Sequence, residues 1–282
     1  MDKIFIIIQH LLPQHLLSRC TGWLASLRHP VWLKNGLIQL FVKRFEVDMS
    51  EAAEPDPTRY LSFNDFFTRP LRDGARPQAA ADLVCPADGA ISQLGAIEFG
   101  RIFQAKGQSF STVELLGGDT QRATQFIDGN FATIYLSPRD YHRVHMPIAG
   151  RLTATSYIPG QLFSVNQVTA ENVPRLFARN ERLVCYFDTA AGPMALILVG
   201  AMIVAGIETV WSGQVAPPTS SPVFRDYVSL PEPVELEQGA EMGRFMLGST
   251  VILLFPKGAV EFDDSYLAGT ATCLGSEFGS LL

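Results

Sequence analysis

The stretch Arg244-Phe-Met-Leu-Gly-Ser-Thr-Val-Ile-Leu-Leu-Phe255 places a Gly-Ser-Thr bend between two apolar runs. Small residues often mark bends next to strands. The run Thr250–Phe255 has the length and apolar character of a buried strand. The simplest interpretation is a bend that leads into a strand, and the alternative is that Ser249 takes part in a reaction.

Other stretches extend this β pattern along the chain. Phe131–Leu136 and Met194–Ile207 are further apolar runs bounded by turn residues. The pattern P-x-x-G-x-[IL]-[ST] occurs at Pro86–Ser92 and again at Pro147–Thr153, each time with a glycine at a tight bend before a strand. This repeat predicts duplicated hairpin units. We therefore expect an α+β protein that is mainly β, with a compact barrel or sandwich body like the lipoyl-type barrel-sandwich hybrid.

The N-terminal segment differs from the body in charge and pattern. Residues 1–45 carry six Lys or Arg and one acid (+5), and the remainder carries 16 bases and 27 acids (−11). Apolar residues at helical spacing over 16–27 and 33–41 predict two amphipathic helices. Such helices could pack on the body or lie in a membrane interface, and the charge asymmetry favours the membrane. No run approaches the ~18 consecutive apolar residues of a membrane span.

The proline-rich and acidic stretch 50–60 predicts a linker. The predicted organisation is a helical, membrane-associating segment over 1–49, the linker, and a β-rich catalytic domain over 61–282. The four cysteines show no close spacing, which argues against a zinc site or a disulfide framework. The body has no basic patch interleaved with aromatic residues, so we expect no nucleic-acid partner.

Candidate chemistry centres on the stretch Tyr135–Pro147, YLSPRDYHRVHMP, which holds His142 and His145. In a helical turn these side chains would share a face, and in an extended segment they would point to opposite faces. Two histidines alone make a poor metal site.

Asp88 has two possible roles. It could shape its own Asp-Gly turn, or it could orient a histidine in a Ser-His-Asp arrangement made of Asp88, His145 and Ser249. Because phosphate-binding and dinucleotide-binding loops are absent, any enzyme chemistry must use side chains or a cofactor made from the chain itself.

Seven stretches, in order, resemble the phosphatidylserine decarboxylase family. They are Phe63–Leu71, Pro86–Gly89, Tyr135–Pro147, Pro159–Asn166, Phe177–Arg182, Ile207–Gly213 and Met242–Thr250. They span nearly the whole body, from about Leu61 to about Phe255.

The resemblance implies that the chain cleaves itself between Gly248 and Ser249. Ser249 then becomes a pyruvoyl group at the start of a small chain, 249–282, which stays associated with the large chain, 1–248. This covalent pyruvoyl would be the cofactor, with no metal and no pyridoxal phosphate. It would form a Schiff base with the amine of phosphatidylserine, which loses carbon dioxide to give phosphatidylethanolamine.

The resemblance also implies roles for single residues. His145 is the base that activates the Ser249 hydroxyl, and Asp88 holds the tautomer of His145 and stabilises its imidazolium form. His142 is the candidate for assisting the return of a proton to carbon. The Thr250 hydroxyl either binds a developing oxyanion or simply starts the strand.

A lipid substrate implies a peripheral membrane enzyme, on the cytoplasmic face of the bacterial inner membrane. Each Lys or Arg near an anionic surface contributes ~1 kcal/mol of attraction. The sequence does not decide whether the protein forms a homo-oligomer.

Two alternative functions are a Ser-His-Asp lipid hydrolase without self-cleavage and a non-enzymatic barrel-sandwich module. The module would need a lysine at a hairpin tip, where Asp88-Gly89 and Ala149-Gly150 stand.

Overall fold

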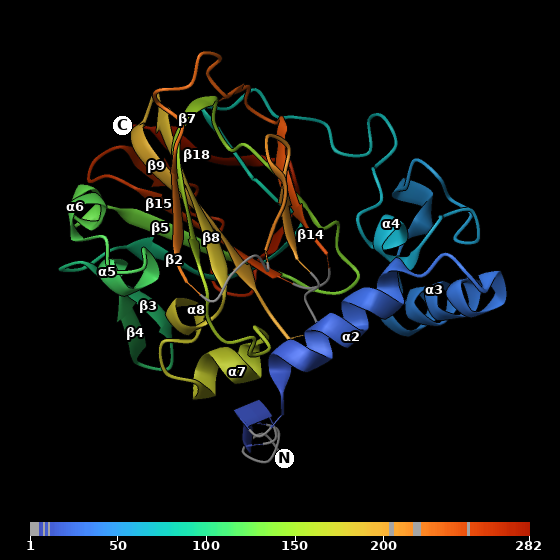
Figure 1. Cartoon of the computed structure of the whole chain (residues 1–282). Helices are drawn as coiled ribbons and strands as arrows, with labels where there is room; N and C mark the ends of the chain where they lie inside the picture. Colours follow the sequence, from blue (N-terminus) through green and yellow to red (C-terminus); the bar gives the residue numbers. More distant parts are fainter. Residues whose placement is uncertain (1–5, 8, 11, 203–205, 217–220, 247–248) are drawn as a thin grey trace.

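A nine-stranded antiparallel sheet organises the body of the protein (Figure 1). The computed structural model describes the chain except residues 1–5, 8, 11, 203–205, 217–220 and 247–248. The strand order is β12-β7-β8-β9-β15-β5-β2-β17, and β13 also pairs with β7. These strands are β2 (Gly89–Ala96), β5 (Asn130–Leu136), β7 (Gly150–Ile158), β8 (Arg182–Thr189), β9 (Gly192–Gly200), β12 (Val223–Asp226), β13 (Glu235–Leu236), β15 (Ser249–Phe255) and β17 (Ala271–Thr272).

Smaller sheets and short helices cover this large sheet. A four-stranded sheet has the order β11 (Gly213–Ala216), β10 (Ile207–Thr209), β14 (Glu241–Phe245) and β6 (Arg143–His145). A three-stranded sheet has the order β1 (Leu83–Val84), β18 (Glu277–Leu281) and β16 (Val260–Phe262), and β3 (Arg101–Ala105) pairs with β4 (Gln108–Ser111). The short helices are α5 (Thr112–Leu115), α6 (Thr120–Ala123), α7 (Gln167–Asn172), α8 (Leu176–Arg179), η1 (Met49–Glu51) and η2 (Thr124–Phe126).

The central strand β15 is buried on both faces. Val251, Leu253 and Phe255 pack into one core together with residues of β14 and β18. Ile252 and Leu254 point the other way, into a second core that includes residues of β3, α5 and α8. Successive side chains of a strand alternate between faces, so a strand covered on both sides has a continuous apolar sequence. The predicted strand at Thr250–Phe255 is confirmed.

The two copies of the repeated pattern both begin strands of the large sheet, as predicted: β2 starts at Gly89 and β7 at Gly150. Gly89 has φ +155°, and a Cβ added there would lie 2.3 Å from the carbonyl oxygen of Tyr135. Only glycine therefore lets β2 approach β5 so closely at this point.

The β-rich class with N-terminal helices is confirmed. In the described part of the chain the strands form open sheets and do not close into a barrel, because the outer strands β12 and β17 do not pair with each other. The lipoyl-like arrangement stays a prediction.

The N-terminal helices lie beside the β body (Figure 1). They are α2 (Gln14–Ser26), α3 (Val31–Phe45) and the short α4 (Phe63–Phe67), so both predicted helices are confirmed. Ile38 of α3 and Phe66 and Phe67 of α4 share a small hydrophobic core. No helix among the described residues is long and apolar enough to cross a membrane.

Candidate active site

Asp88 and Ser249 lie at the same end of the large sheet. Ser249 begins β15, opposite Leu136 of β5 on one side and Gly200 of β9 on the other. The next strand, β2, begins one residue after Asp88 and pairs with the end of β5. Adjacent strands are about 4.8 Å apart, so two strand spacings separate the backbones near these positions. Gly248, on the other side of the expected cleavage point, lies outside the described residues.

The two histidines reach this end of the sheet through the segment that follows β5. β6 carries His145 and pairs with β14, with His145 opposite Glu241. The amide of Phe245, the last residue of β14, donates to the carbonyl of His142 at 3.0 Å. His142 therefore lies beside the end of β14 that is closer in sequence to Ser249, and His145 lies beside the start of β14.

The hydrogen bonds of His145 define its tautomer. Its Nδ1 lies 2.7 Å from the carbonyl oxygen of Gly239, and its Nε2 lies 3.2 Å from the hydroxyl of Tyr141. A carbonyl can only accept, so Nδ1 carries the proton and Nε2 carries the lone pair. Burial is the main cause that lowers the pKa of His145 below its ordinary value. A neutral imidazole with a lone pair on Nε2 is the form that a general base requires.

The carboxylate of Asp88 is held by a different partner from the one expected. Arg76 donates to both oxygens of Asp88 at 2.7–3.0 Å, and the amide of Leu274 donates at 2.8 Å. We expected Asp88 to accept the hydrogen bond from Nδ1 of His145, but the carbonyl oxygen of Gly239 accepts it instead. The physical reason is that the guanidinium of Arg76 occupies the carboxylate with a bidentate, charge-assisted contact. The charge of Asp88 still favours the protonated form of His145.

Arg76 joins this end of the sheet to the N-terminal region, a link that the sequence pattern did not reveal. Its other side donates to both oxygens of Glu51 at 2.6 and 2.8 Å. Two carboxylates on one partly buried guanidinium raise the pKa of Arg76 above its ordinary value. Arg76 is therefore a fixed positive charge at the site.

His142 is completely buried and has one free nitrogen. Its Nδ1 donates to the carbonyl of Asp140 at 2.8 Å, and its Nε2 has no hydrogen-bond partner among the described residues. Burial of the ring away from water lowers the pKa of His142 to about 3. Its ring packs on Phe67 with 4.0 Å between the ring centroids, so the N-terminal helices form part of the surroundings of this histidine.

Arg69 is a second buried cation that sequence reasoning missed. It is 4% exposed, its guanidinium lies 5.4 Å from the centre of the Phe66 ring, and Nη2 donates to the carbonyl of Arg139 at 3.3 Å. Burial lowers the pKa of Arg69, and its charge in turn lowers the pKa of His142. The signal was present in the stretch Phe63–Leu71, where an arginine follows a run of aromatic residues.

Two buried polar atoms close to the end of the sheet have no hydrogen-bond partner in the described structure. Thr250 is fully buried, and its Oγ1 has no partner in the described structure, like Nε2 of His142. Unpartnered buried polar atoms are costly unless another group satisfies them, so both atoms are able to bind a polar group. No cluster of three or more His, Cys, Asp or Glu side chains suited to a metal ion occurs among the described residues.

Comparison with known proteins identifies the family. The sequence model of the family described as "Phosphatidylserine decarboxylase" matches residues 63–280, and a model described as "PSD" matches residues 4–46. The chain is 57% identical over 283 residues to the phosphatidylserine decarboxylase proenzyme of Hahella chejuensis, covering 100% of this chain and 95% of the relative. It is 59% identical over 277 residues to that of Pseudomonas aeruginosa, covering 97% and 96%. The identity to that of Stutzerimonas stutzeri is 58% over 281 residues, covering 99% and 94%. With this coverage and identity, the chain belongs to the phosphatidylserine decarboxylase family.

Proposed function

We propose that this protein is a self-processing, pyruvoyl-dependent decarboxylase that converts phosphatidylserine to phosphatidylethanolamine and releases carbon dioxide. The observation that carries the proposal is the strand register, in which Ser249 begins β15 at the same end of the sheet as Asp88. The relatives named above are phosphatidylserine decarboxylase proenzymes, and the alternative of a Ser-His-Asp lipid hydrolase gains no support from them.

Self-cleavage needs a base, and His145 is suited to that role. A serine hydroxyl is a weak nucleophile at neutral pH until a neighbouring base takes its proton. In the proposed step, the oxygen of Ser249 attacks the carbonyl carbon of Gly248, and Nε2 of His145 takes the proton in place of the hydrogen bond that it accepts from Tyr141. Gly239 fixes the tautomer through Nδ1, and the charge of Asp88 stabilises the imidazolium that forms. The resulting ester then loses the α-proton of residue 249 and expels the carboxylate of Gly248, which leaves a dehydroalanine. Water hydrolyses this residue, with release of ammonia, to the pyruvoyl group at position 249.

In the processed enzyme, a pyruvoyl group from Ser249 would supply an electron-accepting carbonyl for the decarboxylation. The buried imidazole of His142 can accept a proton at Nε2 and return it, since that nitrogen is unprotonated and has no other partner among the described residues. The Thr250 hydroxyl can donate a hydrogen bond to an oxygen that gains negative charge.

The same proposal includes a peripheral position on the membrane. Four large apolar side chains of α2 and α3 are more than half exposed: Leu16, Trp23, Trp32 and Leu40. Between the two helices an apolar groove of about 320 Å³ is lined by residues that include Leu24, Leu37 and Phe41. Amphipathic helices with exposed tryptophans and basic residues are typical of interfacial binding. The four free cysteines fit the reducing cytoplasmic side.

Intact-mass measurement of the purified protein tests the proposal. The wild-type chain is expected to yield two chains, 1–248 and 249–282, with the smaller one blocked at its N-terminus by pyruvoyl. Ser249→Ala should remain a single inactive chain of 31.0 kDa. A single unprocessed wild-type chain with esterase activity would instead support the hydrolase.

A further inference from the structure

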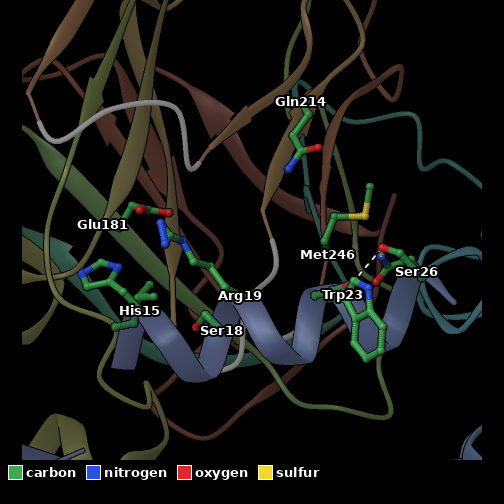
Figure 2. Close-up of a pocket in the computed structure, with 11 residues that line it drawn as sticks. His15, Ser18, Arg19, Trp23, Ser26, Glu181, Gln214 and Met246 are labelled. Atoms are coloured by element: carbon green, nitrogen blue, oxygen red, sulfur yellow. Dashed lines mark hydrogen bonds between the residues drawn. The ribbon is translucent and has the colours of Figure 1, made fainter. Parts of the chain in front are cut away.

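A cavity of about 420 Å³ separates α2 from the end of the large sheet at which β15 begins (Figure 2). Its volume lies within the range of small-ligand pockets. One wall is the inner side of α2, and the opposite wall comes from the β body. The lining includes Arg19 and Trp23 of α2 together with Leu162, Glu181 and Met246 of the body.

The cavity lies beside the reactive position. Met246, on its wall, precedes Ser249 by only three positions. Glu181, on the same wall, accepts a hydrogen bond at its carbonyl from the amide of Gly200, and Gly200 is the direct strand partner of Ser249. Two strand spacings therefore put the backbone of Glu181 roughly 10 Å from that of Ser249.

Glu181 is a buried carboxylate with unused bonding capacity. It is 5% exposed, and its Oε2 accepts a hydrogen bond from the hydroxyl of Tyr157 at 2.9 Å. Its Oε1 has no hydrogen-bond partner, and the carboxylate has no ion pair, within the described structure. Burial raises the pKa of Glu181, and the charge of His15, which lines the same cavity, acts in the opposite direction. A buried charge is costly unless it is paired, so this carboxylate on a cavity wall is suited to a positively charged group of a ligand.

Arg19 provides the opposite charge. It is exposed on α2, and Figure 2 shows its side chain projecting from the helix into the cavity. Its guanidinium has no hydrogen bond or ion pair with any described residue. Arginine binds phosphate through a planar fork of donors, so Arg19 is suited to a phosphodiester.

Building on the proposed function, we propose that this cavity holds the phosphoserine head group of the lipid. Arg19 binds the phosphodiester and Glu181 binds the serine ammonium, which brings the amine to position 249. Each of the two protein charges is opposite in sign to the head-group charge that it contacts. Trp23 lines the cavity and is also exposed, so the cavity adjoins the surface that we place at the membrane.

Binding of short-chain lipids to the full-length Ser249→Ala protein tests this inference without any decarboxylation. The probes are dihexanoyl phosphatidylserine and dihexanoyl phosphatidylglycerol, used as monomers in calorimetry. The second probe has the phosphodiester but no amine. Arg19→Gln should raise the Kd of both probes about tenfold, because both lose a charge-assisted contact. Glu181→Gln should raise the Kd of phosphatidylserine alone, because glutamine still accepts from Tyr157 but carries no charge.

Arg151→Gln is the matched control, since it removes one exposed positive charge at the far end of β7, and its Kd values should stay within twofold of the parent. The inference is overturned if Arg19→Gln behaves like Arg151→Gln. It is also overturned if Glu181→Gln affects both probes equally or neither. Failure of self-cleavage and decarboxylation in the wild-type protein would instead refute the proposed function, so the two failures are distinguishable.

Discussion

His142 and His145 are three residues apart, yet their surroundings suit them to different tasks. Both donate from Nδ1 to a backbone carbonyl, which leaves the lone pair on Nε2. His142 is fully buried and has a pKa of about 3. His145 has a smaller decrease in pKa, because the nearby charges of Glu241 and Asp88 oppose the effect of burial. His145 is therefore the better base for a reaction near neutral pH.

The pH dependence of self-cleavage should report the pKa of His145. The neutral imidazole is the active form, and burial lowers its pKa below the ordinary 6.5. The rate of cleavage of newly synthesised chains should be constant between pH 7 and 8, and it should fall about tenfold per pH unit once the pH is below the lowered pKa. Mass spectrometry over time measures this rate. His145→Ala should abolish cleavage at every pH, and a rate that still rises above pH 8 would indicate a different base.

Arg76 should matter for stability as well as for the site. Its pair with Asp88 is largely buried, with the Arg76 and Asp88 side chains 15% and 10% exposed, whereas the side chain of Glu51 is 36% exposed. Arg76→Met leaves the carboxylate of Asp88 without its charged partner, with only the amide of Leu274 to donate to it, and such a loss typically costs about 3–5 kcal/mol of unfolding free energy. Urea unfolding of Ser249→Ala proteins measures the change.

Arg59→Met is the control for this measurement, because Arg59 pairs with Glu54 but its side chain is 71% exposed. Exposed pairs of this kind contribute about 0–1 kcal/mol. Equal losses of stability in the two variants would show that the Arg76 pairs contribute no more to the unfolding free energy than an exposed ion pair does.

Among the elements, those with strong local patterns were predictable and those that depend on distant contacts were not. The strand β15 and the helices α2 and α3 follow from periodicity, and the strand starts at Gly89 and Gly150 follow from the repeated turn. The bond between His145 and Gly239 joins residues 94 positions apart, so no local pattern encodes it. The same holds for the cation at Arg69, which reaches the site only because α4 packs against the segment around His142.

The exposed tryptophans of α2 and α3 should contribute directly to membrane binding. Trp23 and Trp32 are 69% and 75% exposed, and an aromatic side chain of this size gains free energy by entering the interface. Replacing both with alanine should weaken flotation with vesicles that contain anionic lipid at least tenfold. Phe99→Ala is the control, because Phe99 is 92% exposed but belongs to the loop between β2 and β3 and not to these helices. Unchanged flotation of the double variant would contradict the membrane-bound position of the helices.

In the whole molecule, strands of the proposed small chain pair with strands of the large chain. β15 lies between β5 and β9, β17 pairs with β2, and β18 pairs with β1. The amide of Leu274 also donates to Asp88 across the two parts. These strands share the hydrophobic cores on both faces of the large sheet, so cutting one peptide bond before β15 leaves the backbone pairing and the buried apolar contacts in place.

The two chains should therefore remain together after cleavage until the fold itself is lost. Size-exclusion chromatography in native buffer should give one particle that contains both chains, and strong denaturant should be needed to separate them. Leu253→Ala removes a fully buried side chain of β15, at a typical cost of about 2–5 kcal/mol, and should lower the denaturant concentration at which the chains separate. Release of the small chain from the wild-type protein in native buffer would contradict this account, because the strand pairing and the shared cores would then be too weak to hold it.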